Sequence, residues 1–199
     1  MAVIAYQYRG ELVDQIHRGH IAVTDHTGRI LWKLGDPERL TFARSSAKPL
    51  QAIPVAESGA LEHYGITPQE LAVICSSHNG EPFHVKAVES ILHKAGLSPD
   101  QLCCGAEYPM YVPAEDALKI AGIPRAPIYC DCSGKHAGML ITARHFGEPL
   151  ENYTALEHPV QQRILSVFAE MCGVETSEVQ LAVDLSLIHI SEPTRHSLI

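Results

Sequence analysis

The sequence has few positive charges and no long apolar run, and each absence excludes a class of protein. Its 199 residues carry 15 Lys and Arg against 23 Asp and Glu, a net charge of −8, which argues against nucleic acid or an anionic membrane as a partner. The opening MAVIAYQYRGELV has no basic segment followed by an apolar one, so we expect neither a signal peptide nor a membrane span. With 46% hydrophobic and 19% charged residues and no repeats, the composition is that of a globular domain.

Cysteine is also sparse. The six thiols are too few for a secreted disulfide scaffold, and Cys103–Cys104 and Cys130–Cys132 lie too close along the chain to pair easily with each other. We therefore expect a reducing compartment, the cytoplasm, in which most of the thiols are small buried side chains. No C-x-x-C or H-x-x-x-H is present, so a four-ligand zinc site is not indicated.

The spacing of apolar residues changes along the chain, from the alternation typical of strands to the spacing typical of helices. Residues 20–36 alternate apolar and polar side chains around Asp25-His26-Thr27-Gly28, which predicts a β-hairpin, and residues 3–19 predict one or two more strands beside it. The later segments with helical signals are 46–61, 67–77, 81–96, 98–102, 134–147 and 158–173. Strands followed by a run of helices predict an α+β fold, with an antiparallel sheet packed by helices.

The stretch RSSAKPLQAIP places Ser45 and Lys48 three residues apart, ahead of Pro49. On the first turn of a helix this spacing puts both side chains on one face, where a lysine amine of lowered pKa can act as the base for a serine nucleophile. By itself S-x-x-K is a weak motif that recurs by chance, and on this motif alone a helix-starting serine with a solvated lysine is the favoured interpretation.

Two further motifs follow. CSSHNGEP, residues 75–82, puts serines and backbone N–H groups at a loop–helix junction, which suits an oxyanion or carboxylate but also an ordinary capped turn. CDCSGKHAGM, residues 130–139, spaces Cys132 from Lys135 and Ser133 from His136 by three positions. Cys132 and His136 could form part of a metal site or a nucleophile–base pair. The alternative is that the motif is the glycine-rich start of a helix, where the backbone packs closely.

Taken together and in this order, the three motifs resemble the Rhizobium etli-type L-asparaginase family, and the resemblance spans residues 5 to 184. It implies a fold similar to serine β-lactamases and glutaminases. The implied activity is hydrolysis of the side-chain amide of L-asparagine through a serine acyl-enzyme, in a protein with a small-molecule substrate that forms a homodimer. Another serine amidohydrolase of this fold, such as a glutaminase, and a non-catalytic metal-binding module remain the alternatives.

The resemblance also assigns residues. Ser45 matches the family's nucleophile, Lys48 its base, and Ser77 the first member of a second Ser–Lys pair. The remaining matches are Cys132 and Lys135 as zinc ligands beside the substrate pocket, Asp184 as an aspartate near the substrate, and Arg44 and His136 as members of the matched motifs that we assign to substrate binding.

The match ends after Asp184, where the family continues with Gly-Cys and this chain has Leu185-Ser186. Residues 185–195, LSLIHISEPTR, equal the translation of a common sequencing-library adapter, so we expect residues 185–199 to be non-native and 1–184 to be the N-terminal portion of one asparaginase domain. Without the third zinc ligand and the lysine partner of Ser77, we expect this polypeptide to be inactive. Independent genomic sequence after codon 184 tests this expectation.

Overall fold

The computed structural model describes residues 1–39, 41–183 and 189–192. The strands in these ranges form three two-stranded antiparallel sheets. They pair as β1 (Ala2–Arg9) with β2 (Leu12–Gly19), β3 (Ile21–Thr24) with β4 (Ile30–Leu34), and β5 (Gln180–Val183) with β6 (His189–Glu192). The predicted hairpin is confirmed as β3–β4.

The turn of that hairpin is built by Asp25 and Gly28. One carboxylate oxygen of Asp25 accepts hydrogen bonds from the backbone N–H groups of Thr27 (2.9 Å) and Arg29 (3.1 Å), and Gly28 takes a φ of 82°, which favours glycine. The two N-terminal hairpins do not merge into one sheet. Only His20 separates β2 from β3, and one residue is too short a connection to reverse the chain for antiparallel pairing.

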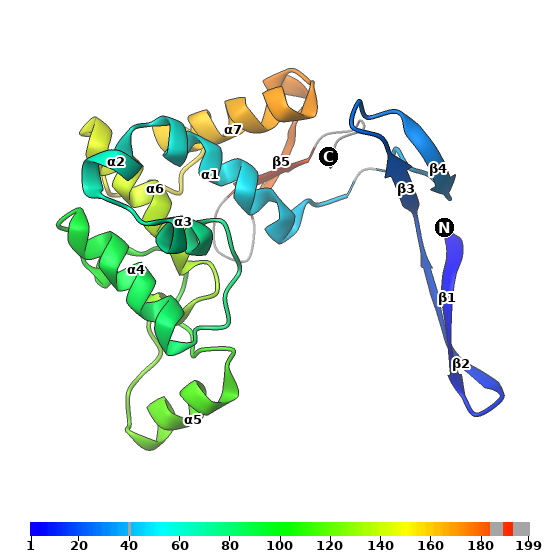
Figure 1. The fold of residues 1–199 in the computed structure, drawn as a ribbon, viewed down its shortest axis with the longest axis horizontal. Coiled ribbons are helices and arrows are strands. Elements are labelled where there is room, and N and C mark those ends of the chain that lie inside the picture. The colour runs from blue at the N-terminus through cyan, green and yellow to red at the C-terminus, as the bar shows by residue number, and fades with distance from the viewer. Residues whose placement is uncertain (40, 184–188, 193–199) are drawn as a thin grey trace.

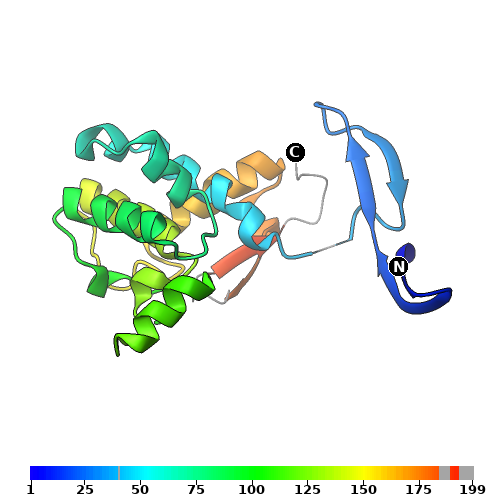
Figure 2. The ribbon, with the colours of Figure 1, turned by 60° about the horizontal axis from the view of Figure 1, so that its bottom comes forward.

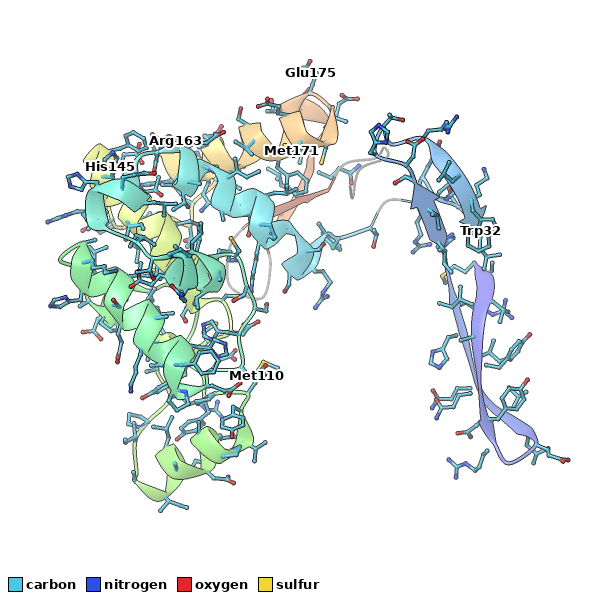
Figure 3. The ribbon with its side chains drawn as sticks, in the orientation of Figure 1. Trp32, Met110, His145, Arg163, Met171 and Glu175 are labelled. Atoms are coloured by element: carbon cyan, nitrogen blue, oxygen red, sulfur yellow. The ribbon has the colours of Figure 1, made fainter. Side chains whose placement is uncertain are left out.

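The N-terminal strands stand beside the helices and expose apolar side chains. Figures 1 and 2 show β1 to β4 on one side of the molecule, joined to the helices by the segment after residue 35. Trp32, labelled in Figure 3, is 52% exposed on β4, and Tyr6 and Tyr8 are about as exposed on β1. The core therefore lies among the helices.

The helical part contains α-helices joined by short 3₁₀ turns. The α-helices are α1 (Lys48–Glu57), α2 (Ala60–Tyr64), α3 (Pro68–Ile74), α4 (Pro82–Lys94), α5 (Val112–Ile120), α6 (Ser133–Phe146) and α7 (Pro159–Cys172). The 3₁₀ turns span Arg44–Ala47, Pro99–Gln101, Pro127–Tyr129 and Thr176–Glu178. Of the helices in the described ranges, none combines the length and the apolar character needed to cross a membrane.

Most of the helix predictions are confirmed, and with them the α+β class. The segment 98–102 forms only a 3₁₀ turn, and α2 and α5 were not predicted. Helix α6 is the centre of the core, because every side chain from Ser133 to Ala143 is buried and α1, α3 and α4 all contact it. Gly134 and Gly138 permit this contact: a Cβ on Gly134 would lie 2.4 Å from the Val73 carbonyl oxygen.

A partly buried ion pair joins α3 to α4. Glu70 closes the capping box of α3 with Thr67, and its carboxylate oxygens lie 2.7 and 2.9 Å from the Lys94 amine. Burial pushes the pKa of Glu70 upward, but the hydrogen bonds from Lys94, Ser90 and Thr67 outweigh it and lower the pKa to about 2. The charged pair therefore stabilises the fold above pH ~4.5, and this contribution is lost as the pH falls toward 2.

We expect Glu70→Gln to lower the free energy of unfolding at pH 7 by about 2 kcal/mol, because the half-buried Lys94 amine loses its counter-charge. The loss relative to wild type should shrink as the pH falls from about 4.5 toward 2, because Glu70 is protonated first in the unfolded chain and then in the folded protein. Urea unfolding at several pH values measures both effects. Glu115→Gln, which breaks the exposed pair with Lys119 on α5, is the matched control and should cause no measurable change. A pH-independent loss in Glu70→Gln would contradict the assignment.

Candidate active site

Four polar side chains from three separate segments meet at one end of α1. Ser45 and Lys48 come from the 3₁₀ turn and first residue of α1, Ser77 from the loop after α3, and Asp131 from the turn before α6. The Ser45 and Ser77 hydroxyl oxygens lie 3.0 Å apart, and Ser77 Oγ lies 3.1 Å from Asp131 Oδ2. The Lys48 amine donates to Ser77 Oγ and lies 3.9 Å from Asp131 Oδ2. The structure thus brings together three of the sequence-predicted residues.

The direction of these hydrogen bonds follows from donor capacity. A serine hydroxyl has one proton, and Ser77 donates its proton to the Asp131 carboxylate, which can only accept. Ser77 Oγ must therefore accept from both Lys48 and Ser45, so that Ser45 is the donor in the serine pair. Ser77 is the hydroxyl that links Ser45 to the charged groups.

The buried and exposed parts of the cluster are separated. Lys48 is only 2% exposed, whereas Ser45 and Ser77 are exposed and Asp131 is partly exposed. Partial burial raises the pKa of Asp131, but the Lys48 charge and the hydrogen bonds from Cys132 and Ser77 outweigh it and hold the pKa below its ordinary value. A solvent-side ligand therefore meets two hydroxyls backed by an ion pair.

The backbone at Arg44 and Pro49 sets the positions of Ser45 and Lys48 at the start of α1. Arg44 has a φ of 51°, which is uncommon for a non-glycine residue and is strained, directly before Ser45. Pro49 occupies the first turn of α1, where its missing N–H has no partner to lose. In this geometry the Lys48 amine bonds to Ser77, 29 residues away, and reaches Ser45 through it.

His78 holds two of the segments together. Its backbone N–H donates to the Asp131 carbonyl (3.1 Å), and its ring Nδ1 accepts from the Gly80 N–H (3.1 Å). Nε2 therefore carries the proton and donates to Ser133 Oγ (2.9 Å), at the start of α6. Burial, with added repulsion from His84, lowers the pKa of His78 to about 4, so the ring stays neutral at physiological pH.

Thiols lie directly beside this cluster. Cys130 and Cys132 are buried and free, and one ligand atom from each of Cys130, Asp131 and Cys132 lies within 4.8 Å of the others. Hydrogen bonding to Cys104 and burial raise the pKa of Cys130 to about 12, and contact with Cys130 and burial raise the pKa of Cys132. The charges of Lys135, which is buried, and Lys48 act in the opposite direction on the pKa of Cys132.

The other predicted site residues lie elsewhere or outside the described chain. His136 is completely buried in α6, with its Nδ1 2.7 Å from the Tyr153 hydroxyl. Arg44 precedes Ser45, and Asp184 lies outside the described residues. Sequence reasoning missed Asp131 and His78, although both stand inside the quoted motifs. An acidic residue between two cysteines, directly before a helix, was the available signal for Asp131.

Two exposed hydroxyls set over a buried lysine in an α+β fold are the parts of a hydrolase site. The comparison with known families is more specific, because the L-asparaginase II family model matches residues 5–185. The chain therefore belongs to the L-asparaginase II family and is an asparaginase-type amidohydrolase acting on a small molecule. No match is found among the curated proteins.

Proposed function

We propose that this protein is an L-asparaginase of the Rhizobium etli type, which hydrolyses L-asparagine to L-aspartate and ammonia through an acyl-enzyme on Ser45. The observation that carries the proposal is the exposed Ser45–Ser77 pair, 3.0 Å between oxygens, seated on the buried Lys48 amine. Amide hydrolysis at neutral pH needs a base for the attacking hydroxyl, and this chain of contacts supplies one.

In the attack step, Lys48 acts as the free amine, and the Ser77 hydroxyl turns its proton from Asp131 toward that amine. Ser45 Oγ forms a bond to the side-chain amide carbon, its proton passes to Ser77 Oγ, and the Ser77 proton passes to the Lys48 amine. The Asp131 carboxylate, 3.9 Å away, stabilises the ammonium that forms on Lys48. Collapse of the tetrahedral intermediate breaks the C–N bond, and the leaving nitrogen takes the proton back as ammonia.

Water then releases aspartate by the same route. It loses a proton through Ser77 to Lys48 while its oxygen attacks the ester carbon, and the proton returns to Ser45 Oγ as the ester C–O bond breaks. The resemblance matches Asp184 to an aspartate near the substrate, and we propose substrate binding for Arg44 and His136 because they belong to the matched motifs.

Zinc is the metal that the resemblance implies, with Cys132 and Lys135 as ligands. The chemistry of the site fits it, because Cys132 lies in a cluster of sulfur and carboxylate donors whose ligand atoms are within 4.8 Å of one another. When bound, zinc would supply positive charge beside the substrate pocket.

The remaining features of the proposal concern the cellular setting. Six free cysteines support a reducing compartment, and we propose the cytoplasm. We further propose a homodimer, on the resemblance alone.

The decisive experiment compares amide substrates. Because we propose that residues 185–199 are non-native, the experiment uses the protein encoded by the gene after its sequence beyond codon 184 has been determined. This protein is called the resequenced enzyme below. We expect ammonia release from L-asparagine at a higher kcat/KM than from L-glutamine, and no opening of a penicillin. Preference for glutamine or penicillin would replace this proposal with one of the alternatives.

The nucleophile is tested by trapping and by paired variants. An electrophilic asparagine analogue should label Ser45, located by peptide mass spectrometry. Ser45→Ala should abolish both label and turnover, whereas Ser46→Ala, one residue away with its hydroxyl bonded to the Ala43 carbonyl, should retain both. Label on Ser77, or full turnover in Ser45→Ala, would overturn the assignment of Ser45.

A further inference from the structure

Asp131 is the more accessible of the two charged groups in the Ser45–Ser77 cluster. Its side chain is 33% exposed, whereas that of Lys48 is 2% exposed. The Lys48 amine donates to Ser77 Oγ and faces Asp131 from inside the protein. A ligand that enters from solvent therefore meets two hydroxyls and a negative charge, while the compensating positive charge stays buried.

The two oxygens of Asp131 face different neighbours. Oδ1 lies 3.7 Å from Cys130 Sγ. Oδ2 accepts the Ser77 proton, with 3.1 Å between the two oxygens. An ionised carboxylate can only accept hydrogen bonds, so each oxygen is stabilised by a donor and destabilised by another acceptor. Oδ2 is the oxygen on the side of the hydroxyl pair.

The attack step of the proposed mechanism takes the donor of Oδ2 away. Ser77 turns its proton from Asp131 toward Lys48, and a carboxylate oxygen that loses a donor is destabilised unless another donor replaces it. The attacking Ser45 Oγ lies 3.0 Å from Ser77 Oγ, which in turn lies 3.1 Å from Oδ2. Oδ2 is thus at most two hydrogen-bond lengths from the attacking atom, within reach of a group bonded to the substrate carbon.

The side-chain amide of the substrate carries a suitable donor. A primary amide has an N–H₂ group with two protons to donate, whereas the acid that hydrolysis produces has two oxygens that only accept and a negative charge at neutral pH. Beside Oδ2, the amide forms a hydrogen bond and the acid meets a like charge. A site built to bond an N–H group strongly rejects the analogue that lacks it.

We propose that Asp131 selects the side-chain amide over the corresponding carboxylic acid, with Oδ2 accepting from the substrate N–H₂ group and repelling the carboxylate of the product. The same repulsion favours release of L-aspartate and limits product inhibition. This role rests on the proposed function for the identity of the substrate, but it concerns amide against acid and applies to any amide that the enzyme binds.

Binding without turnover is measured by titration calorimetry on Ser45→Ala in the resequenced enzyme, which should bind L-asparagine more tightly than L-aspartate. Addition of Asp131→Asn removes the charge and supplies an N–H donor. It should tighten the binding of L-aspartate by at least about 10-fold, because juxtaposed like charges are strongly unfavourable, and change that of L-asparagine by less. A purely structural role for Asp131 would instead weaken the binding of both ligands.

Two control variants separate local from general effects of charge. Asp116→Asn removes the same charge from the exposed surface of α5 and should leave both affinities unchanged. Asp131→Glu keeps the charge and should still reject L-aspartate. A third ligand needs no change at Asp131: the β-methyl ester of L-aspartate is neutral but has no side-chain N–H, and its affinity should lie between those of L-asparagine and L-aspartate.

The proposal would be overturned by L-aspartate binding that is unchanged or weaker in folded Asp131→Asn, by equal tightening in Asp116→Asn, or by an ester that binds as tightly as L-asparagine. Circular dichroism establishes that each variant is folded, and the order of the three ligands decides the matter if Asp131→Asn does not fold. A preference for L-glutamine over L-asparagine would count against the proposed function alone, because the same comparison then uses L-glutamine and L-glutamate.

Discussion

We expect Lys48→Met in the resequenced enzyme to release ammonia from L-asparagine about 10³-fold more slowly than wild type, with little change in KM. Methionine keeps the length and burial of the lysine stem, but it can neither accept the Ser77 proton nor donate to Ser77 Oγ. Removal of a positioned base costs about 10²–10⁴-fold in rate. Steady-state ammonia release, measured in parallel with trapping by the electrophilic analogue, should show loss of both.

Controls for this result come from the same chain. Lys119→Met removes an exposed lysine on α5 and should leave kcat unchanged. Ser77→Ala should resemble Lys48→Met, because both break the route from Ser45 to the amine, whereas Ser76→Ala, whose hydroxyl bonds to the Val73 carbonyl, should not. Retention of more than a tenth of the wild-type kcat in Lys48→Met would show that the base lies elsewhere.

Sequence reasoning located helices best where local chemistry marks their ends. Thr67 caps the start of α3 and Pro68 occupies its first turn, and Gly173 ends α7 in the left-handed conformation. These signals need no tertiary contact. Helix α5 was missed because proline-rich turns flank it and none of its side chains is fully buried, so its apolar period is weak.

The assembly of strands could not be predicted from periodicity. The alternation in residues 3–34 predicts strands but not their partners, and two separate hairpins resulted because His20 alone joins β2 to β3. Pairing depends on connection length and on surfaces elsewhere in the fold, which a local pattern does not contain.

The sequence predicted most of the residues of the site but not the hydrogen bonds that join them. Helical spacing suggested that Lys48 serves Ser45 directly, whereas its bond is to Ser77, and Asp131 enters from the turn before α6. These contacts depend on how α6 packs against the end of α3. Both interpretations of the motif at the start of α6 apply. Gly134 allows close packing, and Asp131, just before the helix, takes part in the site.

That packing gives the largest expected effect on stability. We expect Gly134→Ala to lower the free energy of unfolding by about 3 kcal/mol and the midpoint of thermal unfolding by roughly 10 °C. The added Cβ would lie 2.4 Å from the Val73 carbonyl oxygen and 2.8 Å from its carbonyl carbon, so one backbone must move. Val73 lies four residues before Ser77, so the same shift should separate Ser77 from Asp131 and reduce turnover.

Gly138→Ala, one turn further along α6, is the matched control. Its Cβ would meet the Ile74 Cγ2 atom at 2.7 Å, the end of a side chain that can rotate, and not a backbone. Both variants gain the same helix propensity, up to about 1 kcal/mol, so the difference between them isolates the backbone contact. Thermal unfolding followed by circular dichroism measures both. Equal losses in the two variants would show that α6 and α3 are not held together through Gly134.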